Sequence, residues 1–444
     1  MKSTNEIRFV DLFAGIGGIR KGLEISLSKS KLRGKCVFSS EINVRAQETY
    51  QLNFGEVPEG DIRQINFLPK HDILLAGFPC QSFSYAGKQK GFADTRGTLF
   101  FEIERLLNAS EDKPNLLLLE NVRGFITHDN GRTYATVLSK LKNLGYEVTP
   151  LLLNSSNFGV PQNRVRIYLV CRLGTPASIS IQSDIGASDS HKFKKALMQG
   201  ELFPIATPHL CVKDILETSV DAKYFCSSMF TSQLTKAIHP KSLDCLHGVR
   251  LIDHRGGNSI HSWDMGKNGL CSLKERHLMD AIISNRRKKH FGASQDGKKL
   301  TFVQIQSFWN EPDLKTTLDS LILMGYLKEV NGKYNPVCGN MSFEVFKFLD
   351  PSSISITVVS SDAERLGVVQ NGRPRRITPR ECARLQGFPD SFHLHPVDSF
   401  AFHQLGNSVS VPVVTSIFND FFKNNKLIAE NNSSCKDLIT KLGL

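Results

Sequence analysis

Short apolar runs alternate with helix-like stretches through the first 175 residues, and this alternation limits the fold more than any other feature of the chain. Alternating strands and helices are typical of a parallel sheet covered by helices, and continuously apolar runs are typical of strands buried on both faces. We therefore predict a doubly wound α/β domain. Its strands are predicted at Ile7–Phe13, Cys36–Glu41, Asp72–Phe78, Asn115–Asn121, Glu147–Leu153 and Arg166–Cys171. Its helices are predicted at Gly17–Ser28, Val44–Asn53, Thr98–Asn108 and Gly131–Leu144.

The pattern changes after Arg172, where small and polar residues predict a linker or surface excursion. The amphipathic stretch Leu314–Leu327 and the turn at Val330–Tyr334 allow two interpretations: a winged-helix-like unit, or a helical hairpin with a β-ribbon and no DNA role. Regular structure is predicted to return with Thr378 as a helix N-cap and with a second helix from Val411 to Lys423.

The chain carries a strong positive charge, with 55 Lys and Arg against 43 Asp and Glu over 444 residues, a net charge of +12. Such an excess attracts anionic partners, nucleic acid first and an anionic membrane surface second. It is concentrated at Lys223–Leu300, where 14 basic residues face 6 acidic ones. No apolar run is long enough to span a bilayer, and the first residues lack a signal peptide, so we expect a soluble, intracellular protein.

Ten cysteines are spread along the chain, and no two form a CxxC pair. This spacing argues against a zinc ribbon and against a secreted disulfide framework. We therefore expect free thiols and no bound metal.

A glycine-rich turn follows the first predicted strand, in the run Phe9–Gly18. Such a turn at a helix N-terminus suits a nucleotide-like ligand, although a purely structural turn is about as common. A dinucleotide fingerprint requires a third glycine where this chain has Arg20, which disfavours NAD(P). Carboxylates at Asp11 and Glu41 suit a ribose, and S-adenosylmethionine fits these features.

Cys80 follows the predicted strand Asp72–Phe78, at the sheet edge where α/β proteins bind ligands. A deaminase-like zinc site would require a second cysteine where this chain has Phe83. Cys80 is therefore better interpreted as a thiolate nucleophile, although an isolated loop cysteine is more often a buried, inert thiol.

Five segments in order resemble the signature motifs of the DNA (cytosine-5)-methyltransferase family: Asp11–Gly18, Gly77–Ser84, Glu120–Val122, Gln162–Arg166 and Leu405–Val409. The resemblance covers roughly residues 7–172 and 375–423. It implies a doubly wound mixed sheet of the S-adenosylmethionine-dependent methyltransferase type, with a smaller irregular target-recognition domain. It also implies methyl transfer to carbon 5 of a flipped-out cytosine in duplex DNA.

The same resemblance assigns roles to individual residues. Cys80 would add to carbon 6 of cytosine, Glu120 would stabilise N3, and Arg166, Arg164 and Gln162 would position the base. Cofactor contacts would fall to Phe13, Ala14, Gly15, Gly17, Gly18, Glu41, Asp61, Ile62, Pro79, Asn407 and Val409. The loop Gln81–Leu99, with Gln81, Ser84 and Arg96 as candidate DNA contacts, would close over DNA. From charge alone, we expect Arg286, Arg287, Lys288 and Lys289 to bind phosphates.

These expectations define a domain layout and a cellular context for the protein. We predict a catalytic and cofactor domain at 1–174, a variable target-recognition domain at 175–374, a hinge at 375–400, a returning helix at 401–424 and a tail at 425–444. We expect a cytoplasmic, nucleoid-associated bacterial enzyme, monomeric on DNA and paired with a restriction endonuclease. The alternatives are an RNA (tRNA) cytosine-5 methyltransferase on the same core, disfavoured by the long variable region, and a catalytically silent DNA-binding relative.

Overall fold

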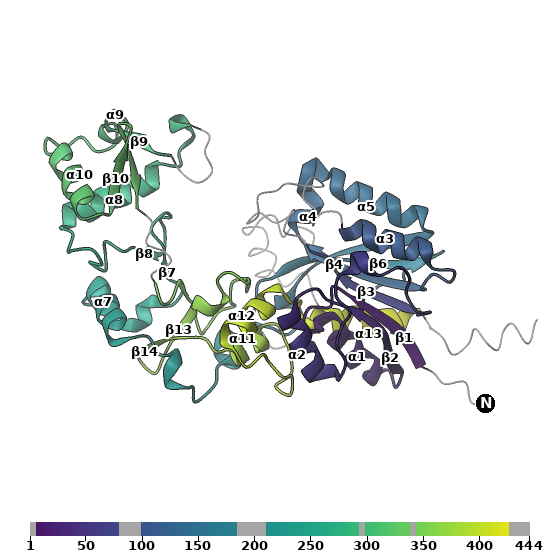
Figure 1. Cartoon of the computed structure of the whole chain (residues 1–444). Coiled ribbons are helices and arrows are strands. Elements are labelled where there is room, and N and C mark those ends of the chain that lie inside the picture. Colours follow the sequence, from purple (N-terminus) through teal and green to yellow (C-terminus); the bar gives the residue numbers. More distant parts are fainter. Residues whose placement is uncertain (1–5, 80–98, 184–209, 293–297, 338–342, 426–444) are drawn as a thin grey trace, which may run out of the picture. The chain divides into compact units, whose positions relative to one another are not determined.

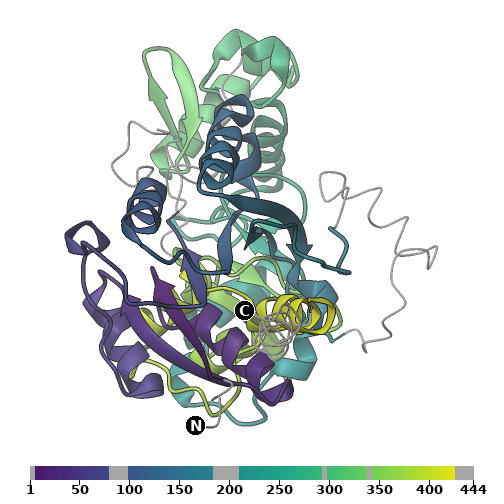
Figure 2. The same ribbon diagram turned by 90° about the vertical axis from the view of Figure 1, so that its right-hand side faces the viewer.

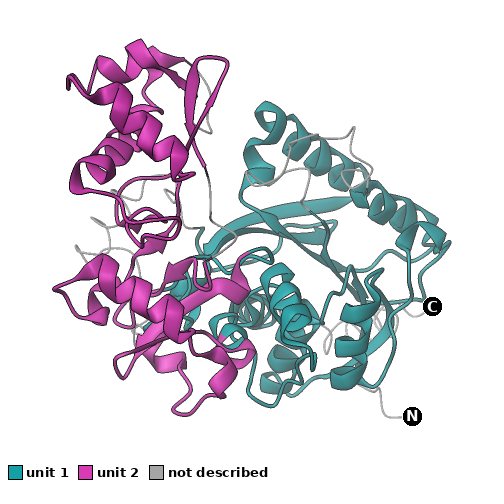
Figure 3. Ribbon diagram, turned by 60° about the vertical axis from the view of Figure 1, so that its left-hand side comes forward, with its two compact units in different colours: residues 1–211, 355–361, 382–444 teal, residues 212–354, 362–381 magenta. Residues whose placement is uncertain are grey.

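The computed structural model describes residues 6–79, 99–183, 210–292, 298–337 and 343–425 (Figure 1). Two compact units divide the chain (Figure 3). Unit 1 holds Met1–Cys211, Ser355–Ser361 and Cys382–Leu444, and unit 2 holds Val212–Ile354 and Asp362–Glu381. The seven residues of Ser355–Ser361 therefore belong to unit 1, although they lie within the stretch predicted as variable. The domain limits drawn from sequence stay a prediction.

Unit 1 is built on a six-stranded sheet in the order β2-β1-β3-β4-β6-β5. Strands β1 to β4 pair in parallel, as the alternation predicts, while β6 is antiparallel to both β4 and β5. The sheet is thus mixed, as the family resemblance implies. Its strands are β1 (Glu6–Leu12), β2 (Arg33–Ser40), β3 (Ile73–Gly77), β4 (Leu116–Val122), β5 (Tyr146–Asn154) and β6 (Val165–Leu173).

Helices cover both faces of this sheet because successive strand residues point to opposite sides. On β1, Val10 and Leu12 join a core with α3 and α5, while Ile7 and Phe9 join a core with α1 and α13. In Figure 2, the yellow α13 lies beside the purple α1. The helices of unit 1 are α1 (Gly18–Lys29), α2 (Val44–Phe54), α3 (Leu99–Ala109), α4 (Gly124–Thr127), α5 (Arg132–Asn143), α12 (Asp398–Asn407) and α13 (Val411–Asn424).

Unit 2 contains two small sheets, in the orders β10-β11-β9 and β14-β13-β12-β7-β8. The strands are β7 (Arg250–Leu251), β8 (Ser259–Ile260), β9 (Leu300–Thr301), β10 (Leu327–Val330), β11 (Lys333–Pro336), β12 (Lys347–Phe348), β13 (Leu366–Gln370) and β14 (Arg373–Arg376). The helices are α7 (Ser228–Ile238), α8 (Leu273–Asn285), α9 (Phe302–Gln306) and α10 (Leu314–Leu323). Helix α11 (Pro379–Leu385) continues from this unit into unit 1.

Two features of the later chain follow from local sequence. The Thr378 hydroxyl accepts a hydrogen bond from the Glu381 N–H at 3.1 Å, so the predicted N-cap is present. Helix α13 covers Val411–Asn424 and buries Val413, Val414 and Ile417. Within the described residues, no helix is long and apolar enough to cross a membrane.

Candidate active site

The glycine-rich turn joins β1 to α1 through three residues with left-handed backbone, Phe13, Gly15 and Gly17. At Gly17 (φ +82°), an added Cβ would lie 2.2 Å from the Phe54 ring, so only glycine fits there. The Glu41 carboxylate holds the turn, because it accepts the Gly15 N–H at 2.8 Å and the Asn43 N–H at 2.7 Å. Glu41 is therefore fixed at the end of β2 beside the start of α1.

A pocket of about 540 Å³ opens over this turn. The predicted cofactor residues that line it are Phe13, Ala14, Gly15, Gly18, Glu41, Asp61, Ile62, Pro79, Asn407 and Val409. Gly17 is not part of the lining, because it faces Phe54 and Tyr50 instead. Most of the cofactor residues predicted from the sequence therefore line one continuous cavity, although they lie up to about 400 residues apart in the chain.

Asp61 is held in place by Arg63, another residue of the pocket lining. The Arg63 guanidinium donates to both carboxylate oxygens, from Nε to Oδ1 at 3.0 Å and from Nη2 to Oδ2 at 2.5 Å. These hydrogen bonds hold the pKa of Asp61 below its usual range, so the carboxylate is charged at neutral pH.

Asp11 and Arg20 form a buried cluster that does not line the pocket. The Arg20 guanidinium lies 4.1 Å from the centre of the Phe54 ring and pairs with Glu24 at 2.7 Å. Asp11 accepts the Tyr50 hydroxyl at 3.3 Å, and burial raises the pKa of Asp11 to about 7. The arginine that replaces the third fingerprint glycine thus packs into the fold behind the turn.

Glu120 and Arg166 also line the pocket, from the ends of β4 and β6. The Arg166 Nε lies 3.3 Å from the Glu120 Oε1, and the two side chains are 13% and 11% exposed. Burial raises the pKa of Glu120, and the charges of Arg166 and Arg164 oppose this rise. This environment favours a protonated Glu120 more than water does.

Arg164 and Gln162 contact the strap, the segment Ser355–Ser361. Arg164 donates to the Val358 carbonyl at 2.8 Å and to the Ser408 carbonyl, while its side chain lines the pocket. Gln162 is fully buried outside the pocket lining and bonds the Val358 N–H and the Leu385 carbonyl, both at 2.8 Å. Both residues therefore join the start of β6 to the strap.

The strap passes directly over Gly406, one residue before Asn407. An added Cβ on Gly406 would lie 2.2 Å from the Ser360 nitrogen, so any larger residue would displace main chain. Glycine at this position allows the strap to lie against the end of α12. The pocket wall at Asn407 and Ser408 is thereby fixed from behind.

Several predicted residues lie outside the described part of the chain: Cys80, Gln81, Ser84 and Arg96. The last described residue before them, Pro79, lines the pocket. In the sheet, Gly77 pairs with Glu120, so β3 ends beside that carboxyl group.

The basic run at the end of α8 divides into two kinds of residue. Arg286 is only 5% exposed and donates to the Asn335 side chain at 2.9 Å, which ties α8 to β11. Arg287, Lys288 and Lys289 are exposed. The predicted DNA contacts of this run stay a prediction. Of its four basic residues, Arg287, Lys288 and Lys289 are the exposed ones.

Sequence reasoning missed His403 and Gln404, which line the pocket from α12. Gln404 is held by the Thr49 hydroxyl at 3.0 Å and by the Arg45 carbonyl at 2.7 Å. The sequence could have indicated His403, because it precedes the predicted cofactor residue Asn407 by four residues and would share its face of a helix. The sequence predicted one returning helix over 401–424, whereas the structure has two, α12 and α13, with a break after Asn407.

Comparisons with known proteins agree with this geometry. The family model for C-5 cytosine-specific DNA methylases matches residues 7–423. The Type II methyltransferase M.BanI of Aneurinibacillus aneurinilyticus is 59% identical over 420 residues, covering 95% of this chain and 96% of that protein. The Type II methyltransferase M.HgiCI of Herpetosiphon aurantiacus is 59% identical over 418 residues, covering 94% of this chain and 98% of that protein.

A solved structure, that of the Entamoeba histolytica methyltransferase EhMeth, shares the fold with a TM-score of 0.54 and 17% identity, over 95% of this chain and 99% of that one. The α/β methyltransferase fold predicted from the sequence is confirmed. With its sheet, its pocket and a family match over nearly the whole chain, this protein belongs to the C-5 cytosine-specific DNA methylases.

Proposed function

We propose that the protein transfers a methyl group from S-adenosylmethionine to carbon 5 of a flipped-out cytosine in a short, specific duplex DNA site. The observation that supports this most directly is the joint placement of Glu120, Arg164 and Arg166 in the wall of the pocket that the glycine turn borders. A base held at that wall lies beside the cofactor cavity. Extrusion of the base is required because a stacked cytosine is closed to attack above and below its ring.

The residues around the pocket fit S-adenosylmethionine. Glu41 keeps lone pairs for ribose hydroxyls beyond its hydrogen bonds to the Gly15 and Asn43 N–H groups, and Asp61 and Ile62 also line the cavity. The turn leaves the α1 N-terminus facing a ligand, and the cavity is of the size usual for small-molecule sites. Bound there, the cofactor supplies the methyl group that the reaction consumes.

In the proposed mechanism, the Cys80 thiolate forms a bond to carbon 6 of cytosine and pushes the ring electrons toward N3. Glu120 gives its proton to N3, and Arg166 holds the O2 oxygen, so the developing charge is stabilised. Carbon 5 would then take the methyl group as the methyl–sulfonium bond breaks, with its electron pair staying on the departing thioether. A base would remove the carbon 5 proton, the Cys80 sulfur would leave as a thiolate to restore the ring double bond, and the N3 proton would return to Glu120.

The proposed setting is a bacterial restriction-modification system, because M.BanI and M.HgiCI are named Type II methyltransferases. There the enzyme would protect host DNA from a cognate endonuclease at the nucleoid and act as a monomer on its site. An RNA substrate is disfavoured because the matching family is that of C-5 cytosine-specific DNA methylases.

The proposal is tested by incubating the protein with labelled S-adenosylmethionine and duplex DNA, beside the Cys80→Ser variant. We expect label in the DNA with the wild type and none above background with Cys80→Ser. Cys245→Ser is the matched control, because Cys245 is an exposed free thiol in unit 2 and should leave transfer intact. Unchanged transfer by Cys80→Ser would refute the covalent mechanism.

Bisulfite sequencing of DNA from cells that express the protein tests the target. We expect one short sequence to be protected at a single cytosine position throughout. Methylation only of RNA in the same cells would overturn the DNA assignment.

A further inference from the structure

A separate small core lies within unit 2, between Trp263 and Tyr334. It is formed by side chains from α8, α9, α10 and the strands β9, β10 and β11. Buried residues such as Phe230, Leu251 and Phe348 belong to a different core of the same unit. Residues 263–337 are therefore a module with its own hydrophobic centre, which Figure 1 shows with α8, α9, α10 and β9 grouped together.

The order of elements in this module is that of a winged helix. A helix (α8) is followed by a short strand (β9), two helices joined by a turn (α9 and α10), and a hairpin (β10 and β11). The second hairpin strand pairs with the first strand, with Lys333 opposite Thr301 and Tyr334 opposite Leu300. Proteins with a helix-turn-helix usually place the second helix, here α10, in the DNA major groove.

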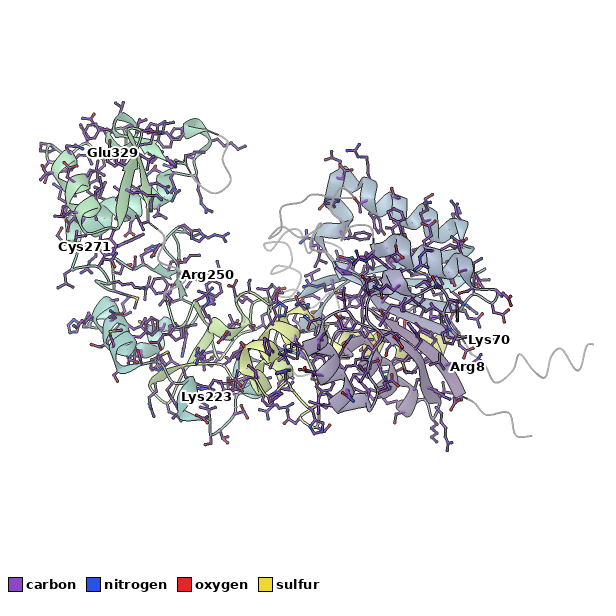
Figure 4. All side chains as sticks on the ribbon, in the orientation of Figure 1. Arg8, Lys70, Lys223, Arg250, Cys271 and Glu329 are labelled. Carbon is purple, nitrogen blue, oxygen red and sulfur yellow. The ribbon has the colours of Figure 1, made fainter. Side chains whose placement is uncertain are left out.

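The α10 side of the module is poorly suited to that role because two of its lysines, Lys315 and Lys274, are already paired with carboxylates. Lys315 lies 2.9 Å from Asp319 and 3.8 Å from Glu329, which Figure 4 labels on the hairpin. Lys274 lies 2.5 Å from Asp313 and 3.3 Å from Glu311, the carboxylates just before α10. Phosphate binding at this side would have to break these pairs and approach carboxylates.

The other end of the module gathers positive charge that is not paired in this way. We define the α8 corner as Arg287, Lys288, Lys289 and Lys299 of the module together with Arg255, which precedes the module in the chain. All five residues are exposed. The described part of the chain places no carboxylate in ion-pair contact with Arg255, Arg287, Lys288 or Lys289.

Three chain segments converge at this corner. The Lys298 N–H donates to the Arg286 carbonyl at 3.0 Å, and its amine donates to the Lys288 carbonyl at 2.7 Å, so the chain before β9 runs along the end of α8. The loop at Gly256 lies against Ile283 and Ser284 of α8. Burial lowers the pKa of His254, and the nearby charges of Arg255 and Arg287 lower it further, which places both arginines around one imidazole.

We propose that this winged-helix module contacts duplex DNA through the α8 corner, by phosphate binding, and does not use the α10 face or the hairpin. The inference rests on the proposed function and specifies the surface of unit 2 that holds the DNA backbone. Exposed Lys and Arg side chains from three segments provide the charge that displaces counterions from DNA. Phosphate contacts of this kind contribute affinity and position, not sequence discrimination.

The test compares two charge-matched double variants of the full chain, Lys288→Glu/Lys289→Glu at the corner and Lys328→Glu/Lys333→Glu on the hairpin. All four lysines are exposed, and each variant changes the net charge equally. Binding to a duplex without a methylation site is measured by fluorescence anisotropy across a salt series. Thermal unfolding establishes that both variants are folded.

We expect the corner variant to reduce the slope of log K against log salt by about 2, since each lost phosphate contact removes about 0.9, and to weaken binding roughly tenfold at low salt. The hairpin variant should keep the wild-type slope. An equal or larger loss in the hairpin variant would overturn the inference, as would two unchanged variants.

Methyl transfer by the wild type is measured in the same preparation. If the wild type methylates DNA and neither variant alters binding, the inference fails and the proposed function stands. If the wild type methylates no DNA, the proposed function itself fails, and the inference falls with it.

Discussion

Each unit of the protein buries an Arg–Glu pair, and the two pairs are built differently. In unit 2, the guanidinium of Arg375 contacts both carboxylate oxygens of Glu381, at 2.6 and 2.9 Å, and both side chains are fully buried. The Glu381 oxygens also accept the N–H groups of Glu217 and Thr378. In unit 1, the Arg166 Nε lies 3.3 Å from the Glu120 Oε1, at the wall of a pocket.

We interpret the difference as one between a structural pair and the proposed proton donor Glu120. A buried ion pair is stable only when further hydrogen bonds satisfy its remaining atoms, as they do around Arg375 and Glu381. Glu120 is buried enough for its pKa to rise, yet it faces a cavity. A carboxyl group in that state is suited to give up a proton to a ligand.

Loss of Arg375 should produce the largest effect. Arg375→Ala leaves Glu381 charged and buried without its partner, and we expect the free energy of unfolding of unit 2 to fall by about 3–5 kcal/mol. Chemical denaturation measures this loss. Arg132→Ala is the control, because Arg132 pairs with Asp129 while 73% exposed and should cost less than about 1 kcal/mol. Equal losses in the two variants would remove the distinction between the pairs.

Glu120→Gln should reduce the catalytic rate much more than it reduces stability. The amide keeps the shape of the side chain but has no acid proton, so we expect kcat to fall about 10²- to 10³-fold. Thermal stability should fall far less than in Arg375→Ala, because burial already favours the neutral, protonated form of Glu120 and the glutamine oxygen can still accept from Arg166. Steady-state kinetics and unfolding of the same samples give both values. A large loss of stability with kcat preserved would make Glu120 a structural residue like Glu381.

The smallest effect concerns pH. Because the folded pKa of Glu120 is raised, the native state holds this proton more tightly than the unfolded chain, and stability from this group is lost as pH rises. We expect the melting temperature of Glu120→Gln to gain on that of the wild type from about pH 4 upward and to level off above the folded pKa. Calorimetry from pH 4 to 8 measures this, and a difference that shrinks with pH would contradict it.

The sequence predicted unit 1 far better than unit 2, for physical reasons. Strands such as β3 and β4 are buried on both faces, so their apolar runs are visible without any structure. The motif residues of the pocket stand at strand and helix ends, where turn chemistry shows in the sequence. The strands β7, β8, β9 and β12 have two residues each, too short to show a period. Arg286 shows a second limit of sequence-based prediction. The residue type alone does not reveal whether a charged side chain is exposed or paired inside a core.

The strap over Gly406 has a consequence for exchanging recognition regions between relatives. Residues Ser355–Ser361 lie between two parts of unit 2 in the sequence but supply the Val358 partners of Gln162 and Arg164. A chimera that replaced 212–381 as one block would also replace these hydrogen-bond partners and the main chain that Gly406 accommodates. A transplant that keeps the host's own seven residues, and takes only the segments on either side of them, preserves the back of the pocket while the proposed recognition surface changes.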